Sequence, residues 1–329
     1  MHGYPFKHPR IVAVNDEVLP PQWARRFEKD RVRLYVATLY DNEAKNGKLY
    51  PAYCILGQGI ARGDHKGATV AIDSTSGNYG VGLEVARRYY KSRDPAFPIE
   101  KVVMVVARSL PKGKRDRLTE AGIELVDAAD SIDAMRVAKM VAEERGYWYT
   151  KQYWNTDNSD GWRPVAENIA QQLPDIGMVA WGVGSGGGCS GVMPVFQERF
   201  KARDFPLWRV AVVVEEGEKI GGVRDESALE PGSLAWRGDN IDEARFVTER
   251  QSNLFCSALW RQDLHVGPST GFAAEGACLA MRSLSLMRKL DKYRAADGCV
   301  HILVPSLDTR MPYRSEFEKA GIYLRENEW

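Results

Sequence analysis

The chain has 329 residues, and its 45 lysines and arginines nearly balance 44 aspartates and glutamates, giving a formal net charge of +1. That balance excludes the broad positive field used by proteins that bind nucleic acids or membrane surfaces. A hydrophobic content of 44% with 27% charged residues excludes a largely disordered chain and allows a large core, in two lobes or in one α/β unit.

Strand-like and helical patterns alternate through the first half of the chain. Short runs rich in β-branched and aromatic residues predict strands, and segments with apolar residues three or four positions apart predict helices. The predicted strands are 34–40, 68–73, 101–107 and 123–126, and the predicted helices are 50–60, 81–90, 114–121 and 132–145.

The second half continues this alternation after an aromatic segment at 147–149 and a loop at 155–161. We predict helices at 163–172, 192–201, 251–260 and 272–290, and strands at 176–181, 208–214 and 300–304. The stretch 217–242 lacks periodicity and is predicted to be a long functional loop. The repeated strand, helix, strand order predicts parallel sheets covered by helices on both faces.

Cysteine usage and the N-terminus bear on the compartment. The five cysteines are widely spread and form no Cys-x-x-Cys pair, which favours a reduced, cytoplasmic setting. No apolar run approaches the roughly 20 residues that span a bilayer, and the first ten residues lack the apolar core of a signal peptide.

The five histidines show no metal-ligand spacing, so no metal site is expected. Two basic runs, 111–117 and 282–294, are predicted to be solvated helix faces.

Two polar turns, 74–80 and 182–191, each follow a predicted strand and precede a helical pattern. Open α/β proteins place their ligands at such turns. The second turn is dense in glycine, so its backbone N–H groups can approach an anion closely, and the following helix N-terminus favours negative charge. We therefore predict a phosphate site there.

Gly182, Gly184 and Gly187 also match a dinucleotide fingerprint, with Glu215 and Glu216 ending the next strand, so a nicotinamide-dependent dehydrogenase is an alternative.

Three motifs in one order resemble the fold type II family of pyridoxal phosphate enzymes, especially its cysteine synthase and cystathionine β-synthase branch. The stretch 75–80 is similar to the family's Ser/Thr-Ser-Gly-Asn-x-Gly turn, 184–188 to its Gly-Thr-Gly-Gly-Thr loop, and 267–271 to its Gly-x-Ser-Ser-Gly turn. The resemblance implies a two-lobed, tryptophan synthase β-like α/β fold, each lobe a mostly parallel sheet flanked by helices. The implied domains are a large cofactor-binding domain, 1–45 plus 155–329, and a small substrate-facing domain, 46–154, inserted in it.

The family holds its cofactor, pyridoxal 5′-phosphate, as a Schiff base on a lysine that also moves the substrate's α-proton. That lysine lies about 30 residues before the asparagine of the first turn, in the pattern Asn-Pro-x-x-Ser-x-Lys. Lys48 lies 30 positions before Asn78 (78 minus 48) and six after Asn42 (48 minus 42), so it is the expected catalytic residue, with Lys45 as the reserve. The family's Pro, Ser and Asp-Arg are replaced by Glu43, Asn46 and Leu49-Tyr50.

The resemblance assigns further roles one residue at a time. Asn78 would hydrogen-bond the cofactor's ring hydroxyl, and Gly188 replaces the last threonine of the family's phosphate loop. The residues expected to bind the substrate carboxylate are Thr75, Ser76, Gln152 and the backbone of Tyr79. The residues expected to bind the phosphate are Gly184, Ser185, Gly186, Gly187 and Gly188. The candidates for meeting the ring nitrogen are Ser306, Asp308 and Thr309, with a hydroxyl favoured because it suits elimination better than an aspartate does.

The implied activity is β-replacement or β-elimination on a small amino acid of the O-acetylserine, serine or cysteine type, and the implied assembly is a homodimer. Replacement is favoured because the resemblance is strongest to the synthase branch. Alternatives are a serine or threonine dehydratase or deaminase of the same fold, and a catalytically altered relative that keeps the fold as a binding subunit. The altered residues around Lys48 motivate the last alternative.

Overall fold

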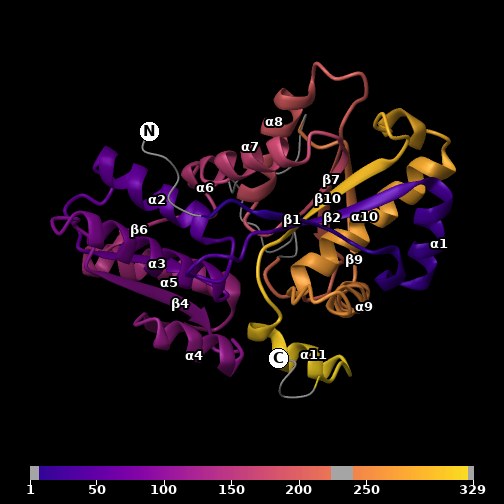
Figure 1. Ribbon diagram of the computed structural model, residues 1–329. Coiled ribbons are helices and arrows are strands. Elements are labelled where there is room, and N and C mark those ends of the chain that lie inside the picture. Colours follow the sequence, from indigo (N-terminus) through magenta and orange to yellow (C-terminus); the bar gives the residue numbers. More distant parts are fainter. Residues whose placement is uncertain (1–6, 224–239, 325–329) are drawn as a thin grey trace. The chain divides into compact units, whose positions relative to one another are not determined.

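The structure is a computed structural model, which describes residues 7–223 and 240–324. The chain forms two compact units (Figure 1). The first unit comprises 1–42 and 163–329, and the second unit comprises 43–162. The predicted domain boundaries, after 45 and 154, differ from these by three and eight residues. Most of the predicted loop at 217–242 lies outside the described residues.

The first unit contains a six-stranded sheet with the order β1-β2-β10-β7-β8-β9. Its strands are β1 (Arg10–Ala13), β2 (Val32–Thr38), β7 (Ile176–Gly182), β8 (Trp208–Val214), β9 (Glu243–Val247) and β10 (Val300–Ser306). All neighbours are parallel except β1, which runs antiparallel to β2. The central strands are almost continuously apolar because helices cover both faces of the sheet.

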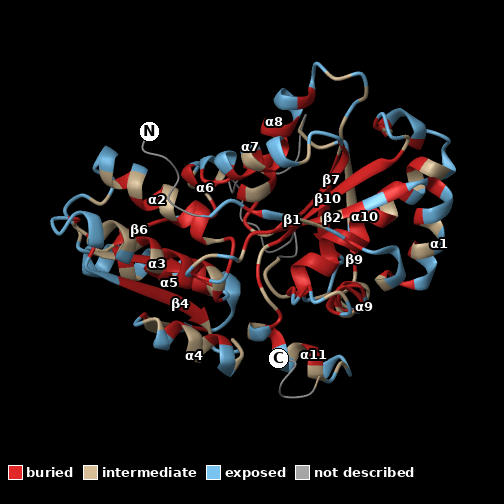
Figure 2. Ribbon diagram, viewed as in Figure 1, coloured by how far each residue is buried: buried red, intermediate tan, exposed pale blue. Residues whose placement is uncertain are grey.

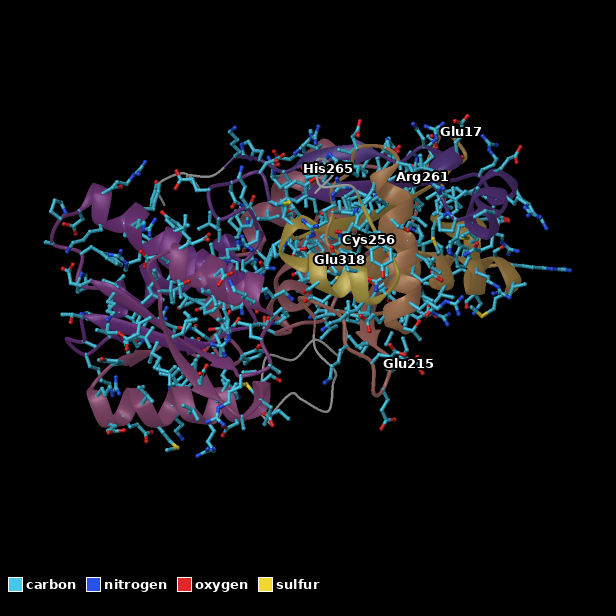
Figure 3. All side chains as sticks on the ribbon, turned by 90° about the horizontal axis from the view of Figure 1, so that it is seen from below. Glu17, Glu215, Cys256, Arg261, His265 and Glu318 are labelled. Atoms are coloured by element: carbon cyan, nitrogen blue, oxygen red, sulfur yellow. The ribbon has the colours of Figure 1, made fainter. Side chains whose placement is uncertain are left out.

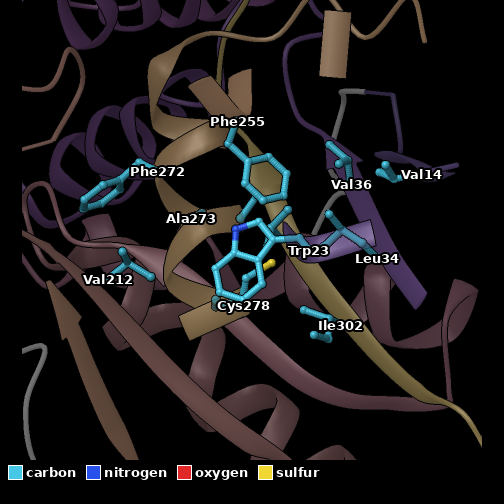
Figure 4. Close-up of a cluster of buried hydrophobic side chains, with 14 of the residues drawn as sticks. Val14, Trp23, Leu34, Val36, Val212, Phe255, Phe272, Ala273, Cys278 and Ile302 are labelled. Atoms are coloured by element: carbon cyan, nitrogen blue, oxygen red, sulfur yellow. The ribbon is translucent and has the colours of Figure 1, made fainter. Parts of the chain in front are cut away.

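In the first unit, α10 lies on β7, β8, β9 and β10 and against α9, whereas α7 and α8 pack on each other and α8 also contacts β7. Its main helices are α1 (Pro21–Asp30), α7 (Arg163–Gln172), α8 (Gly187–Phe200), α9 (Glu249–Trp260), α10 (Pro268–Leu286) and α11 (Arg314–Lys319). Short 3-10 turns occupy Asp16–Val18, Leu290–Tyr293 and Met311–Tyr313. The α10 helix and the central strands are buried along most of their length (Figure 2). Figure 4 shows the Trp23 indole of α1 among Phe255, Cys278 and Leu34 in this core.

The second unit contains a four-stranded, wholly parallel sheet with the order β5-β4-β3-β6. Its strands are β3 (Val70–Ser74), β4 (Lys101–Ala107), β5 (Glu124–Ala128) and β6 (Trp148–Tyr149). Its helices are α2 (Leu49–Arg62), α3 (Asn78–Arg93), α4 (Lys112–Glu120), α5 (Ser131–Arg145) and α6 (Asp157–Asp160). The alanines Ala134, Ala138 and Ala142 let α5 pack closely on β3 and β4. Helix α3 packs on β4 and on α2.

The predicted fold class is confirmed, with local differences. The predicted loop at 155–161 contains the short helix α6, and the predicted turn at 267–271 forms the first turn of α10. Helix α8 begins at Gly187, five residues before its predicted start at 192 (192 minus 187). The elements β1, α1, β6, β9 and α11 were not predicted from the sequence.

Neither described segment of the chain has a helix long and apolar enough to cross a membrane. Within the same residues, no group of three or more His, Cys, Asp or Glu side chains is arranged to hold a metal ion. All five cysteines are free thiols, and four of them are buried.

Candidate active site

In the second unit, the turn after β3 presents polar groups at the start of α3. Gly77 precedes the helix with φ 128°, a conformation that side chains rarely adopt. The Thr75 hydroxyl oxygen accepts hydrogen bonds from the backbone N–H groups of Gly77 (3.0 Å) and Gly80 (3.2 Å). Because that oxygen is occupied as an acceptor, the Thr75 hydroxyl hydrogen can be donated to another group. Ser76 is exposed at the tip of the turn.

A buried carboxylate, Asp73, organises this turn. Its Oδ1 accepts from the backbone N–H of Ser74 (2.8 Å), and its Oδ2 accepts from the Thr150 hydroxyl (2.6 Å) and the backbone N–H of Gln152 (2.9 Å). The Gln152 side chain donates to the Ser74 carbonyl (2.7 Å). The structure therefore brings Gln152 to the turn at 74–80, about 75 residues away in sequence. Sequence reasoning missed Asp73, although an aspartate that ends a buried strand marks such a position.

Tyr79 lies in the first turn of α3, and its side chain is only 3% exposed. Its hydroxyl is 3.0 Å from the Thr150 hydroxyl oxygen. Burial raises the pKa of the Tyr79 phenol well above its ordinary value, with a further contribution from Asp73. The side chain is therefore a neutral structural group, and the backbone N–H is the part of Tyr79 that a ligand can use.

Lys48 precedes the first residue of α2 and is half-buried. Its backbone N–H donates to Asn46 Oδ1 (2.9 Å), and Asn46 is fully buried. A side chain on Gly82 would begin 2.8 Å from the Lys48 carbonyl carbon, so α3 contacts this backbone directly. Since Gly82 lies one helical turn after Asn78, the structure brings Lys48 and Asn78 into the same part of the second unit. Lys45, by contrast, is exposed with φ 51°.

In the first unit, the glycine-rich turn runs directly into α8. Gly186 precedes the helix in a left-handed conformation, with φ 82°, and Gly187 and Gly188 are its first residues. The N–H groups of a first helical turn have no partner within the helix, and the dipole of this 14-residue helix favours an anion. Ser185 is almost fully buried beside them. This arrangement suits a phosphate group.

The replacement of the family's last threonine by Gly188 has a steric cause. A side chain on Gly188 would begin 2.4 Å from Nε1 of Trp181, at the end of β7. A side chain there would require the Trp181 ring to move, because a carbon atom cannot approach it that closely. The sequence gives no indication of this pairing, since the two residues meet only after folding.

The glycine-rich turn lies close to the end of β10. A side chain on Gly184 would begin 3.2 Å from the Gly222 carbonyl oxygen. One on Gly222 would begin 3.8 Å from Asp308 Oδ2 and 3.9 Å from Ser269 Cβ. Within the first unit, the predicted phosphate loop and the predicted ring-nitrogen segment therefore occupy one neighbourhood.

The three candidates for the ring nitrogen differ in their surroundings. Ser306 is fully buried and lies 2.9 Å from the Thr270 hydroxyl, which donates to it. Asp308 is also fully buried and accepts from the hydroxyls of Tyr313 and, at 3.4 Å, Ser269. Thr309 is half-buried and pairs with Val266 through the backbone.

Cys256 is the thiol nearest this segment, and it lies on α9 (Figure 3). Its Sγ donates to the carbonyls of Val266 (3.1 Å) and Gly267 (3.3 Å). Burial raises the pKa of this thiol well above its ordinary value, and the negative charge of Asp308 raises it further. Cys256 therefore ties α9 to the start of α10 and is not a nucleophile.

Comparisons with known proteins cover most of the chain. A family model described as pyridoxal-phosphate dependent enzyme matches residues 24–292. The N-(2-amino-2-carboxyethyl)-L-glutamate synthase of Ralstonia nicotianae is 27% identical over 265 residues, 76% of this chain and 75% of that protein. A cysteine synthase of Staphylococcus aureus is 27% identical over 175 residues, 51% of this chain and 53% of that protein. An O-acetylserine dependent cystathionine beta-synthase structure from Helicobacter pylori has a TM-score of 0.77 at 19% identity, covering 97% of this chain and 96% of that one.

Proposed function

The chain belongs to the pyridoxal-phosphate dependent enzyme family, and on that premise we propose that it catalyses β-replacement on a small amino acid of the O-acetylserine, serine or cysteine type. Family members bind pyridoxal phosphate, which supports a phosphate site over a dinucleotide site in the glycine-rich turn at 182–191. The enzyme is cysteine synthase-like. The choice of substrate and nucleophile is our proposal.

The observation that carries the proposal is the position of Lys48. Its backbone is held by Asn46 and lies against α3 at Gly82, one turn from Asn78. A lysine and an amide in the same part of the second unit suit a cofactor that needs an amine for its aldehyde and a donor for its ring hydroxyl. The altered neighbours of Lys48 leave these two groups together, which supports an active enzyme over the binding-subunit alternative.

The residues present also fit the rest of the cofactor. The first turn of α8 offers N–H groups that have no partner within the helix, and these suit a phosphate. We propose that the phosphate is bound by Gly184, Ser185, Gly186, Gly187 and Gly188. Pyridoxal phosphate supplies an electron sink for the α-carbon of a bound amino acid.

The chain's own groups would then bind the substrate and move its proton. We propose that Thr75 and Ser76 donate their hydroxyl hydrogens to the substrate carboxylate, together with the backbone N–H of Tyr79. Gln152 assists by holding the turn through Ser74. The Lys48 amine accepts the proton from the substrate α-carbon and returns it after the β-substituent has been exchanged.

The group at the ring nitrogen affects the choice of reaction. An aspartate would keep the ring protonated, whereas a hydroxyl leaves it neutral and suits exchange at the β-carbon. We propose Ser306, because the Asp308 carboxylate accepts from Tyr313 and Ser269, whereas the hydrogen bond that the Ser306 hydroxyl donates, to the Asp308 carbonyl, is long at 3.4 Å and can be exchanged for one to the ring nitrogen. In this proposal Asp308 and Thr309 shape the segment that carries Ser306. Comparing the visible spectra of Ser306→Ala and Asp308→Asn tests the choice, because the residue at the ring nitrogen changes the spectrum most.

The names of the relatives support replacement over elimination. One relative is named a synthase of an N-substituted glutamate and another a cysteine synthase, so the nucleophile to be tried first is an amine or sulfide. Incubating the enzyme with O-acetylserine and either sulfide or glutamate, and identifying products by mass spectrometry, separates the two. Pyruvate formed without any nucleophile would instead favour the dehydratase or deaminase alternative.

Trapping with borohydride tests the assignment of Lys48. Purified protein loaded with pyridoxal phosphate should be yellow, and reduction should attach the cofactor to the peptide that contains Lys48. Lys48→Ala should lose the visible band and the label, whereas Lys45→Ala, three residues away, should keep both. Protein that stays colourless with added pyridoxal phosphate would contradict the proposed function, and a label on Lys45 or Lys66 would move the catalytic role.

We further propose a homodimer in the cytoplasm, which rests on family analogy and on the five free thiols. Light scattering on purified protein tests the assembly state, and a monomeric mass would contradict it.

A further inference from the structure

We propose that Arg117 is a positioning residue that holds Asn78 and the Lys48 segment in one hydrogen-bonded relay. The expected effect on cofactor binding rests on the proposed function, but the hydrogen bonds of the relay lie within the second unit. It runs from Asn78 through Arg117, the Ala44 carbonyl and Asn46 to the Lys48 N–H.

The first step fixes the orientation of the Asn78 amide. Arg117 Nη1 donates to Asn78 Oδ1 at 3.0 Å. A guanidinium group has donors only, so the atom of Asn78 that faces it must be the oxygen. The NH₂ group of Asn78 therefore points the other way, as a donor. That is the orientation needed to hydrogen-bond the oxygen of the cofactor's ring hydroxyl.

The second step reaches the backbone before Lys48. Arg117 Nη2 donates to the Ala44 carbonyl oxygen at 2.6 Å, and Asn46 Nδ2 donates to the same oxygen at 2.7 Å. Asn46 Oδ1 then accepts from the Lys48 N–H at 2.9 Å. Both acceptor positions of the carbonyl are used, and both ends of the Asn46 amide have defined partners.

The relay explains one departure from the family's lysine motif. Asn46 stands where the family has serine, and the asparagine amide both donates to Ala44 and accepts from Lys48. A serine hydroxyl in its place could not reach both groups with the same geometry, because it has one donor on a shorter side chain. Asn46 and Arg117 thus donate to the same carbonyl oxygen.

Helix α4 holds Arg117 in a fixed position. Leu118, the next residue, is fully buried, and its Cδ2 would lie 2.7 Å from a side chain placed on Gly80 of α3. The half-buried Arg117 is therefore held beside the start of α3 rather than on a mobile surface. The same helix offers a matched control in Arg115, which donates to Ala107 and Asp127 and touches neither Asn78 nor Ala44.

The first test examines the relay without relying on the cofactor. Full-length Arg117→Met and Arg115→Met proteins are compared with the wild type by hydrogen exchange, without added pyridoxal phosphate. Arg117→Met should speed exchange in peptides covering 43–50 on the order of tenfold, the loss expected for a charged hydrogen bond, whereas Arg115→Met should leave them unchanged. Equal exchange in Arg117→Met and the wild type would overturn the relay.

The second test examines the consequence for the cofactor. Arg117→Met should weaken pyridoxal phosphate binding on the order of tenfold and change the ratio of visible to near-ultraviolet absorbance, because Asn78 loses its fixed orientation. Arg117→Lys keeps the charge, but its single ammonium group cannot reach both acceptors as the guanidinium does. It should therefore restore only part of the cofactor affinity and of the absorbance ratio. A wild-type protein that binds no cofactor would contradict the proposed function alone; normal affinity and spectrum in Arg117→Met would contradict this inference alone.

A third variant keeps the test decisive if Arg117→Met fails to fold. Asn46→Ala breaks the relay from its other end and should give the same spectral change. Combined with Arg117→Lys, it should add little to the loss caused by either change alone, since both act through one carbonyl. Simple additivity of the two losses would overturn the relay.

Discussion

At the scale of single residues, one tryptophan packs closely against the glycine-rich turn that we propose to bind phosphate. The Trp181 indole fills the space in which a side chain on Gly188 would start, and Trp181 is 1% exposed. The backbone N–H groups of the loop remain, so the loss of the family's threonine removes one hydroxyl donor and no backbone donor. Phosphate binding at this loop should therefore rest on the backbone and on Ser185.

This pairing predicts the effect of Gly188→Ala. The added carbon would force the Trp181 ring to move, so we expect unfolding free energy to fall by on the order of 1–3 kcal/mol in urea titrations. Gly113→Ala is the control, because nothing lies within 4 Å of a side chain there, and a helical alanine should stabilise slightly. The pair Gly188→Ala with Trp181→Phe should cost less than the sum of the single changes; full additivity would contradict the packing argument.

The sequence and the resemblance indicated the residues of the candidate site, but not the side chains that hold them. The glycine-rich turn, Lys48 and Asn78 are recognisable because their spacing along the chain is fixed. Arg117 and Trp181 have no such spacing, and each acts on a residue that lies close only in the folded unit. Asp73 is an intermediate case, because its place at a strand end is visible while its three hydrogen-bond donors are not.

At the scale of elements, the contact between α2 and α3 positions Lys48. Gly82 allows the two helices to approach closely, since a side chain there would begin 2.8 Å from the Lys48 carbonyl carbon. Because α3 meets the start of α2 through main-chain atoms, no side chain can change its conformation to make room at this contact.

We therefore expect Gly82→Ala to act on cofactor binding as well as on stability. Shifting the start of α2 by the width of a methyl group would move Lys48 away from Asn78, and a displacement of about 1 Å is enough to impair a catalytic group strongly. The yield of borohydride labelling on Lys48 should fall, measured by peptide mass spectrometry. Unchanged labelling with reduced stability would show that this contact is structural only.

A second contact between elements carries a pH dependence. Trp23 of α1 donates to Glu275 Oε2 of α10 at 2.7 Å, and burial raises the pKa of this carboxyl from 4.5 to about 7. The folded protein then keeps a proton that the unfolded chain releases above 4.5. The favourable contribution of Glu275 to the free energy of unfolding is complete below pH 4.5. It is lost as the pH rises through about 7, and the loss is on the order of 3 kcal/mol.

Glu275→Gln should remove this dependence while keeping an acceptor for Trp23. The variant should gain stability over the wild type between pH 5 and 8, and the difference should grow with pH, as measured by urea unfolding at several pH values. Glu144→Gln at the surface controls for the change of net charge. A constant difference across this range would mean that Glu275 is ionised in the folded protein.

Element boundaries were harder to predict than element types. The turn at 267–271 and the glycine-rich loop have compositions typical of turns, but both form helix starts. Pro268 suits a first helical position, and Gly186 adopts the left-handed conformation that precedes α8. The strands β1 and β9 escaped prediction because they have four and five residues and lie at the edges of the sheet, where apolar patterning is weak.

At the scale of the whole chain, the two units differ in continuity. The second unit is one segment of 120 residues (162 minus 42) with its own sheet and its own apolar cluster. The first unit needs both ends of the chain, since β2 pairs with β10 along Val32–Thr38 and α1 supplies Trp23 and Phe27 to the core. The strand, helix, strand order predicted parallel sheets, but it could not reveal that an N-terminal strand lies beside the last one.

This difference predicts how fragments behave. The fragment 43–162 should fold alone with cooperative thermal unfolding, because its sheet and core are complete. The fragment 163–329 should not, because it lacks the β2 partner of β10. Circular dichroism and amide NMR dispersion measure both outcomes, and adding a 1–42 peptide should restore structure to the second fragment. A cooperatively folded 163–329 fragment would contradict this view.

The indole beside the phosphate loop has one further use, as an optical probe. Pyridoxal phosphate absorbs where tryptophan emits, so a cofactor whose phosphate lies at α8 would accept excitation energy from Trp181 and shorten its fluorescence lifetime. The chain has nine tryptophans, yet the fastest-decaying component of the loaded protein should vanish selectively in Trp181→Phe. The residue that excluded a side chain from the loop thus reports whether the loop is occupied.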